Sequence, residues 1–215
     1  MDISPVIFWH SDPVGPDETV MISGHLLGKG SSIELLRLDD DKAGKAVKAF
    51  KGNWQGAVGP EILSQEEQAL AFVIPADWKM GIYACRVSRG GAASEPFLIN
   101  APDCWWFQGD KGLRATTAGS WLRALGKALS LNGEASAMLC SGTKSQILKA
   151  GKASQYSLEF AIPDGVAAGE HELFVHNGFG GAAGWRRTGT LTVIAPSTAR
   201  EKTLNVVDLG ADPEG

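Results

Sequence analysis

Residues 70–75 read Leu-Ala-Phe-Val-Ile-Pro, and residues 158–163, 88 positions later, read Leu-Glu-Phe-Ala-Ile-Pro. Each stretch reads as a strand that stops at proline, since proline cannot donate to a strand ladder. Six residues beyond each proline comes a glycine, followed by alternating apolar and polar residues at 82–87 and at 170–175. Period-2 alternation predicts a half-buried strand. The two stretches therefore predict that one β-structured unit occurs twice in the chain.

The match continues on both sides of these stretches. Each copy passes through a glycine-rich turn into a last strand and closes on Ala-Pro, at 101–102 and at 195–196. Upstream, residues 20–24 align with residues 122–126 at an offset of 102. The larger offset means that the first copy carries 14 more residues, which we place between Asp39 and Glu67 as an elaborated polar loop.

These observations predict an all-β chain made of two tandem β-sandwiches, residues 1–102 and 103–196, each of the size usual for immunoglobulin-like domains. Helix is expected to play little part, and we interpret Ser64 to Leu70 as a turn. Both units share one order of features: a core strand that ends in Ser-Gly or Leu-Gly, then the "VIP"-type strand, then the strand that begins after a glycine. This order resembles the immunoglobulin-like IPT/TIG family. That resemblance covers both units and implies immunoglobulin-like topology.

Composition excludes several classes of function. The chain has 215 residues, 44% of them hydrophobic, and a net charge of −4 with its basic residues scattered. Without a clustered basic face, nucleic acid is not an expected partner. No apolar run reaches the length of a membrane-spanning helix, so no membrane span is expected. Three cysteines without a Cys-x-x-Cys pair argue against a disulfide framework and a zinc site.

After Pro196 the composition changes to a polar linker, and then to residues 203–215, Thr-Leu-Asn-Val-Val-Asp-Leu-Gly-Ala-Asp-Pro-Glu-Gly. Asn205 to Ala211 resembles the opening strand of the right-handed parallel β-helix of pectate-lyase-like and polygalacturonase-like enzymes, with Leu209 in place of the usual aromatic residue. The resemblance implies that residues 197–215 are a linker and the first strand of a β-helix domain, and that this domain would be the partner of the two sandwiches. A chance match in a polar C-terminus is the alternative.

Tryptophan supplies the candidate binding residues, because exposed aromatic faces stack on sugar rings while neighbouring polar groups bind hydroxyls. Of seven tryptophans, Trp54 lies in the inserted loop beside Asn53, and Trp185 lies in a long turn beside Arg186. These four residues are the predicted carbohydrate site, although partly buried packing is the commoner role of tryptophan. Trp105 and Trp106 are adjacent, so in a regular strand they face opposite sides, and one is expected at the junction between units.

No catalytic residue, metal site or cofactor is predicted. Acidic residues show no motif that selects a glycosidase pair. Asp39 to Asp41 reads as a solvated turn rather than a calcium loop. His171 and His176, five apart in a predicted strand, face opposite sides and so do not share a metal.

Two functions follow from these observations. The first is a non-catalytic N-terminal accessory region of a polysaccharide-degrading enzyme, a glycoside hydrolase or polysaccharide lyase, which braces the catalytic β-helix and binds polysaccharide. Such a protein would be secreted, periplasmic or on the cell surface, its signal peptide already removed. The alternative is an immunoglobulin-like protein-interaction or adhesion module with no enzymatic parent.

Overall fold

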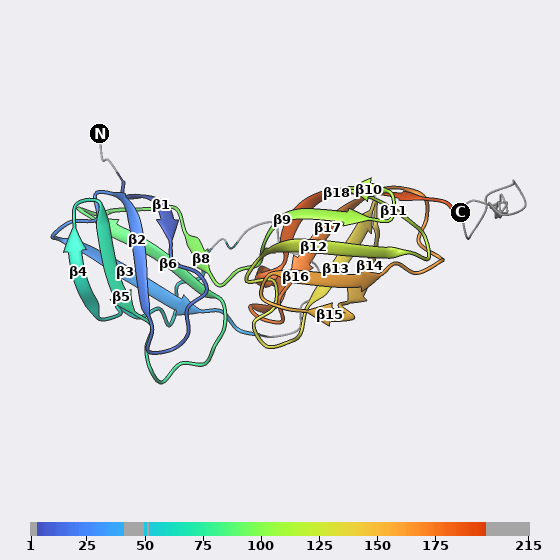
Figure 1. Ribbon diagram of the computed structural model, residues 1–215. Coiled ribbons are helices and arrows are strands. Elements are labelled where there is room, and N and C mark those ends of the chain that lie inside the picture. The colour runs from blue at the N-terminus through green and yellow to red at the C-terminus, as the bar shows by residue number, and fades with distance from the viewer. Residues whose placement is uncertain (1–3, 41–49, 51, 197–215) are drawn as a thin grey trace, which may run out of the picture.

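The computed structural model describes residues 4–40, 50 and 52–196 (Figure 1). Within them every regular element is a strand, apart from one 3-10 turn, η1 (Gly181–Gly184). The segment Ser64 to Leu70, expected to be a turn, is a hairpin: it ends β4 (Ile62–Glu66), turns at 67–68 and opens β5 (Ala69–Val73). The prediction of a turn was therefore too wide, because only two residues leave the strand ladder.

The first sandwich consists of strands β1 to β8. One sheet has the order β1-β2-β5-β4, and the other pairs β3, β6 and β7, with β8 also paired to β6. In β2 every second residue is buried, including Val20 and Ile22, and these side chains pack against Phe72 of β5. The remaining bounds are β1 (Val6–His10), β2 (Thr19–His25), β3 (Ser31–Arg37), β6 (Tyr83–Arg89), β7 (Ala92–Ala93) and β8 (Phe97–Ile99).

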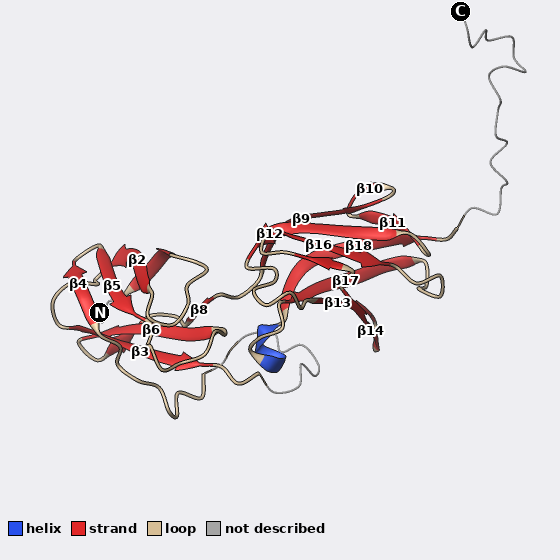
Figure 2. Cartoon of the chain, turned by 60° about the horizontal axis from the view of Figure 1, so that its bottom comes forward, coloured by secondary structure: helices blue, strands red, loops and turns tan. Residues whose placement is uncertain are grey.

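The second sandwich consists of strands β9 to β18. Its sheets have the orders β10-β9-β12-β16-β15 and β11-β18-β17-β13-β14, and Figure 2 shows them as two layers. Leu122, Phe160 and Leu173 come from both layers and meet in one buried core. The bounds are β9 (Asp103–Gly109), β10 (Gly112–Leu113), β11 (Ala115–Thr117), β12 (Trp121–Lys127), β13 (Ser136–Ser141), β14 (Lys144–Lys149), β15 (Lys152–Ala153), β16 (Ser157–Ala161), β17 (Gly169–His176) and β18 (Arg186–Ile194).

The predicted all-β class and the paired sheets of an immunoglobulin-like sandwich are confirmed by this topology, in which the named strands pair antiparallel except for β11, which pairs with β18 in parallel. The two "VIP"-type stretches form β5 and β16, each of which pairs with the strand that the 102-residue offset had aligned. No strand pairing among the described residues joins β1 to β8 with β9 to β18. Strand equivalence therefore explains the repeat in the sequence.

The aligned glycines, Gly24 and Gly126, lie where two strands come unusually close. A Cβ atom on Gly24 would lie 2.0 Å from the carbonyl oxygen of Val6, and one on Gly126 would lie 2.0 Å from that of Asp103. Any larger residue would have to push the neighbouring backbone away. Glycine at these positions thus allows β1 to pair with β2, and β9 to pair with β12.

The loop inserted in the first sandwich returns along the outer edge of β3. Val58 and Leu35 exchange two backbone hydrogen bonds, of 2.8 and 2.9 Å, in an isolated bridge. The corresponding edge of the second sandwich carries a full strand, β14, paired with β13. The insertion therefore covers an edge that would otherwise expose unpaired backbone groups.

Two buried asparagines connect the sandwiches. Asn177, which is fully buried, donates from Nδ2 to the carbonyl oxygens of Asn100 (2.8 Å) and Ala128 (2.9 Å). The side chain of Asn100 is itself bonded to both backbone groups of Val14 and to the Gly81 carbonyl. One amide network therefore ties the end of the first sandwich to two loops of the second.

An ion pair and an apolar cluster complete the junction. Lys127 Nζ lies 3.6 Å from the buried carboxylate of Asp12, whose Oδ1 accepts a hydrogen bond from the Asn100 amide. Burial raises the pKa of Asp12 above its ordinary value, against the opposing effects of Asn100 and Lys127. Beside them, Phe179 packs with Ile82 near η1, which Figure 2 shows between the two halves. Hydrogen bonds, an ion pair and apolar contacts thus all join the two sandwiches at the junction.

We predict that Gly126→Ala lowers the free energy of unfolding by about 1–3 kcal/mol, because the new Cβ overlaps the Asp103 carbonyl oxygen. Urea unfolding followed by tryptophan fluorescence measures the loss. Gly165→Ala is the matched control, since a Cβ there meets nothing within 4 Å. Equal midpoints for the two variants would contradict the close approach.

We also predict that Asn177→Ala destabilises the junction by about 1–3 kcal/mol for each buried carbonyl left without its donor. Differential scanning calorimetry measures the shift in melting temperature. Gln68→Ala removes an exposed amide far from the junction and should stay within about 0.5 kcal/mol of the wild type. A fall as small for Asn177→Ala as for Gln68→Ala would show that the network does not hold the junction.

Candidate functional site

The predicted site residue Trp54 is half-buried, and its ring contacts two other side chains of the first sandwich. Phe50 contacts it edge-on at 5.6 Å between ring centroids, and the Arg86 guanidinium carbon lies 4.5 Å from the ring centroid. Arg86 is fixed there by Glu34 at 2.6 Å, and this hydrogen bond lowers the pKa of the carboxyl. Asn53 is exposed, and its Oδ1 accepts the backbone N–H of Gln55. Trp54 therefore braces the loop against the junction cluster.

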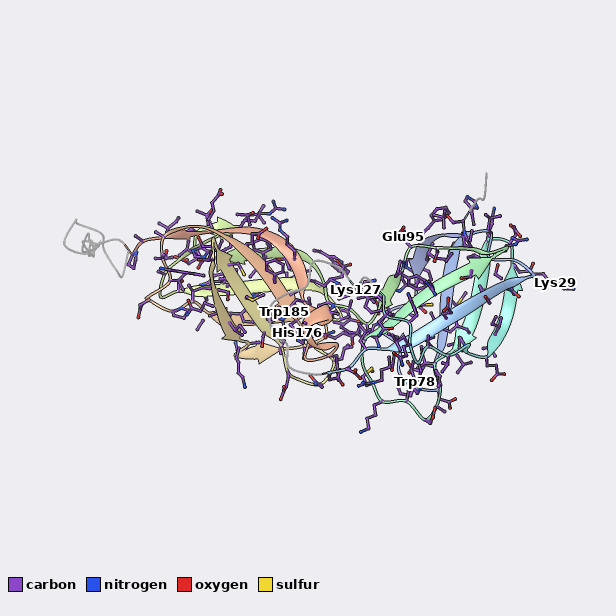
Figure 3. The ribbon with its side chains drawn as sticks, turned by 180° about the vertical axis from the view of Figure 1, so that it is seen from behind. Lys29, Trp78, Glu95, Lys127, His176 and Trp185 are labelled. Atoms are coloured by element: carbon purple, nitrogen blue, oxygen red, sulfur yellow. The ribbon has the colours of Figure 1, made fainter. Side chains whose placement is uncertain are left out.

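The second predicted tryptophan, Trp185, is only 2% exposed and packs against His176 at 4.9 Å between ring centroids. Figure 3 shows both side chains at the end of the second sandwich nearest the first. Arg186 folds onto its own turn and donates to the carbonyls of Ala183 and Trp185. Trp185 therefore offers almost no exposed ring surface to a sugar, because η1 folds the turn back onto the sandwich instead of projecting it.

Trp105 and Trp106 are both exposed, whereas the sequence predicted that they face opposite sides of the strand. A β-bulge in β9 sets Trp106 opposite Leu125 and Cys104 opposite Gly126, so Trp105 is an extra residue between two ladder pairs. The bulge shifts the alternation by one. Both rings are consequently exposed, at 67% and 40%, and the expectation that they face opposite sides was wrong.

Trp121 extends this exposed surface along the same sheet. In β12 the side chains of Trp121, Arg123 and Leu125 alternate with the buried Leu122 and Ala124. Trp121 is 42% exposed and lies four residues from Leu125, which is about 13 Å along a strand. We call Trp105, Trp106 and Trp121, with the polar side chains between them on β12, β15 and β16, the tryptophan face.

Charged groups lie between the rings. Glu159 of β16 is opposite Arg123 and accepts ion pairs from Arg123 (2.5 Å) and from Lys152 (3.0 Å). The hydrogen bonds from Lys152 and Arg123 lower the pKa of Glu159, so this carboxylate stays ionised and acts as an acceptor. A shallow cavity of about 310 Å³ lies beside Trp121 and is lined also by Lys152 and Ala161. Flat apolar rings beside fixed donors and acceptors can bind a ligand that has apolar faces and hydroxyl edges.

Asp110 fixes the far end of this face. Its carboxylate accepts hydrogen bonds from the Thr117 amide (2.7 Å) and the Thr117 hydroxyl (2.7 Å), and the Thr116 hydroxyl donates to the Trp121 carbonyl (2.8 Å). Burial raises the pKa of Asp110, but the hydrogen bonds that its carboxylate accepts, chiefly from the Thr117 amide and hydroxyl, outweigh it and lower the pKa to about 2. The chain entering β12 is therefore held at Trp121.

Other chemistry finds little support in the part of the chain described. There, no three His, Cys, Asp or Glu side chains gather as a metal site, and no helix is long and apolar enough to cross a membrane. His171 and His176 are both buried and bond to separate backbone carbonyls, of Ala167 and of Gly181. Asp40 accepts the Gly180 amide and belongs to the junction, whereas Asp41 lies outside the described residues.

Comparisons with known proteins assign no family to the chain. No family model matches the sequence, and no curated protein matches it. Among solved structures it is similar to SGBP-B of the mixed-linkage glucan utilization locus of Bacteroides ovatus, solved with a mixed-linkage heptasaccharide (19% identity, TM-score 0.30, covering 89% of this chain and 47% of that one). It is also similar to the FN1–FN3 domains of chicken CNTN1 (10%, TM-score 0.29, 89% and 67%) and to the plexin A4 extracellular region (10%, TM-score 0.36, 90% and 16%). The chain thus spans about half of the first structure.

We predict that Asp110→Asn changes the acid stability of the protein. Because the folded pKa of Asp110 is lowered, its stabilisation is present at pH values above the ordinary pKa of 3.8 and is lost as the pH falls toward about 2. The wild type should therefore lose melting temperature more steeply than Asp110→Asn between pH 4 and pH 2, and be the more stable at pH 7. Asp77→Asn, at an exposed carboxylate, is the control. Parallel curves for wild type and Asp110→Asn would contradict the assignment.

Proposed function

We propose that this chain binds polysaccharide through the tryptophan face of the second sandwich. The observation that carries the proposal is the exposure of Trp105, Trp106 and Trp121 on one sheet, around the ion-paired Arg123 and Glu159. Exposed tryptophan is costly to leave in water, and a surface of this kind usually serves a ligand. Sugar rings offer apolar C–H faces to the indoles and hydroxyls to the charged groups.

The role of the chain in a longer protein is proposed from the resemblance of residues 205–211 to the opening strand of a β-helix; these residues lie outside the described part of the chain. If the resemblance holds, residues 1–102 and 103–196 are two accessory modules, and residues 197–215 lead into the catalytic β-helix of a glycoside hydrolase or polysaccharide lyase. The modules would hold the enzyme on its substrate outside the cytoplasm, without catalysing a reaction themselves. In this proposal the β-helix domain alone carries out the catalytic step.

Affinity gel electrophoresis tests the binding. The full chain is run in gels that contain hydroxyethyl-cellulose, xylan, mixed-linkage β-glucan or polygalacturonate. We expect retardation in at least one gel, and we expect Trp121→Ala or Trp106→Ala to weaken it about tenfold. That factor corresponds to about 1.4 kcal/mol, a reasonable share of the roughly 1.5–3 kcal/mol gained on burying an aromatic side chain.

Ile147→Ala is the matched control, because Ile147 is an exposed apolar residue (55%) on β14 of the opposite sheet. It should leave both migration and melting temperature unchanged. Retention that survives both tryptophan changes would move the site elsewhere. Absence of retention in every gel would favour the immunoglobulin-like protein-interaction module instead.

A further inference from the structure

We infer that the ligand is an extended polysaccharide chain that crosses the junction and contacts both sandwiches, rather than a chain end or short oligosaccharide held by one. This inference rests on the proposed function of the tryptophan face. It adds a second contact surface, formed by Phe8 and Trp9 of β1, and it specifies the length of ligand that the protein selects.

The first sandwich repeats the aromatic bulge of the second. In β1, Ile7 is opposite Gly24 and Trp9 is opposite Ser23, so Phe8 is the extra residue. The position of Phe8 corresponds to that of Trp105, and Gly24 corresponds to Gly126 at the aligned offset. Phe8 and Trp9 are exposed by 62% and 55%. The same backbone irregularity therefore turns two consecutive aromatic side chains outward in each sandwich.

Both aromatic pairs lie beside the junction. Lys127 pairs across the sheet with Asp103, at the start of β9, and forms the ion pair with Asp12, just after β1. Trp9 precedes Asp12 by three residues, and Trp106 follows Asp103 by three, so each lies within about 10 Å of the junction along its chain. Figure 1 shows β1 on the side of the first sandwich nearest the second, and β9 starting at the near end of the second.

Beyond Trp9 the next aromatic ring of β1 turns inward. His10 is opposite the buried Ile22 and stacks on Phe97 of β8 at 5.1 Å between ring centroids, with 27° between the planes, and Phe97 packs against the core of the first sandwich. The exposed rings beside the junction are therefore Phe8 and Trp9 on one side and Trp105 and Trp106 on the other, and the Asp12–Lys127 pair joins the two sandwiches there.

The junction makes the two surfaces act together. Its buried Asn100–Asn177 hydrogen bond and its apolar cluster hold the sandwiches in one orientation. A ligand that has bound one surface then meets the second at high effective concentration and without the entropy cost of ordering the two halves. A short oligosaccharide reaches one surface only and gains nothing from the other.

Calorimetric titration of the full chain with a ladder of defined oligosaccharides tests the inference. The ladder is cut from the polysaccharide that retards the protein: cello-, xylo-, mixed-linkage gluco- or galacturono-oligosaccharides. For the wild type we expect affinity to rise at least tenfold between the shortest ligand that binds and the polymer. Trp9→Ala should remove that rise and leave the affinity for the shortest ligand unchanged, whereas Trp121→Ala weakens binding of both.

Leu63→Ala is the matched control, since Leu63 is exposed (53%) on β4, at the opposite edge of the same sheet as β1. It should bind like the wild type. If Trp9→Ala binds the polymer as tightly as Leu63→Ala while Trp121→Ala loses binding, the inference of a ligand that crosses the junction fails. The proposed binding at the tryptophan face is then retained. If the wild type binds none of the ligands, the proposed function fails and the inference with it.

Discussion

The approach of β9 to β12 at Gly126 is the constraint on which the exposed aromatic pair of β9 depends. Glycine lets the Asp103 carbonyl come to a distance that no side chain would allow, and at that point the ladder admits one extra residue. That extra residue changes which side chains face water. A regular strand would direct one of Trp105 and Trp106 inward, and the bulge directs both outward while Phe107 continues into the core. Local backbone geometry thus converts a core strand into one with an exposed aromatic pair.

Buried polar groups connect the two sandwiches at their junction. A buried amide costs little free energy when each of its polar atoms is hydrogen-bonded. The Asn177 amide donates to the Asn100 carbonyl, and the Asn100 amide donates to the Gly81 carbonyl, so the buried groups are paired without a net charge. Directional hydrogen bonds fix an angle between two bodies more closely than apolar packing alone does, because only one arrangement satisfies all of them. The buried Asp12–Lys127 pair adds an opposite-charge match at the edge of the same contact. The proposed binding of a long ligand across the junction requires a fixed angle between the sandwiches as much as it requires affinity at either surface.

The repeat allowed much of the fold to be predicted from sequence, because strand period and the proline and glycine positions are local signals. The aligned pairs Val20/Leu122 and Phe72/Phe160 all lie in the cores, as their alternation indicated. The site was harder to predict. Trp185 was judged by its place in a glycine-rich turn, yet η1 folds that turn back over His176. The exposure of Trp105 depended on a bulge, and the signal for it was present: consecutive aromatic residues in both copies, 97 positions apart, with an aligned glycine in the partner strand.

The charges on the tryptophan face bear on what the surface can do. Glu159 is held by two cations and its pKa is lowered, so it is poorly suited to deliver a proton as a glycosidase acid must. The ion-paired Glu159 and Arg123 instead offer acceptors and donors at fixed positions, which is what recognition of hydroxyl groups needs. The rings supply contact area that depends little on the exact position of the sugar, so a chain can slide to satisfy the polar groups. Apolar area that tolerates different ligand positions, combined with directional charged groups, is what the proposed binding of a polymer requires.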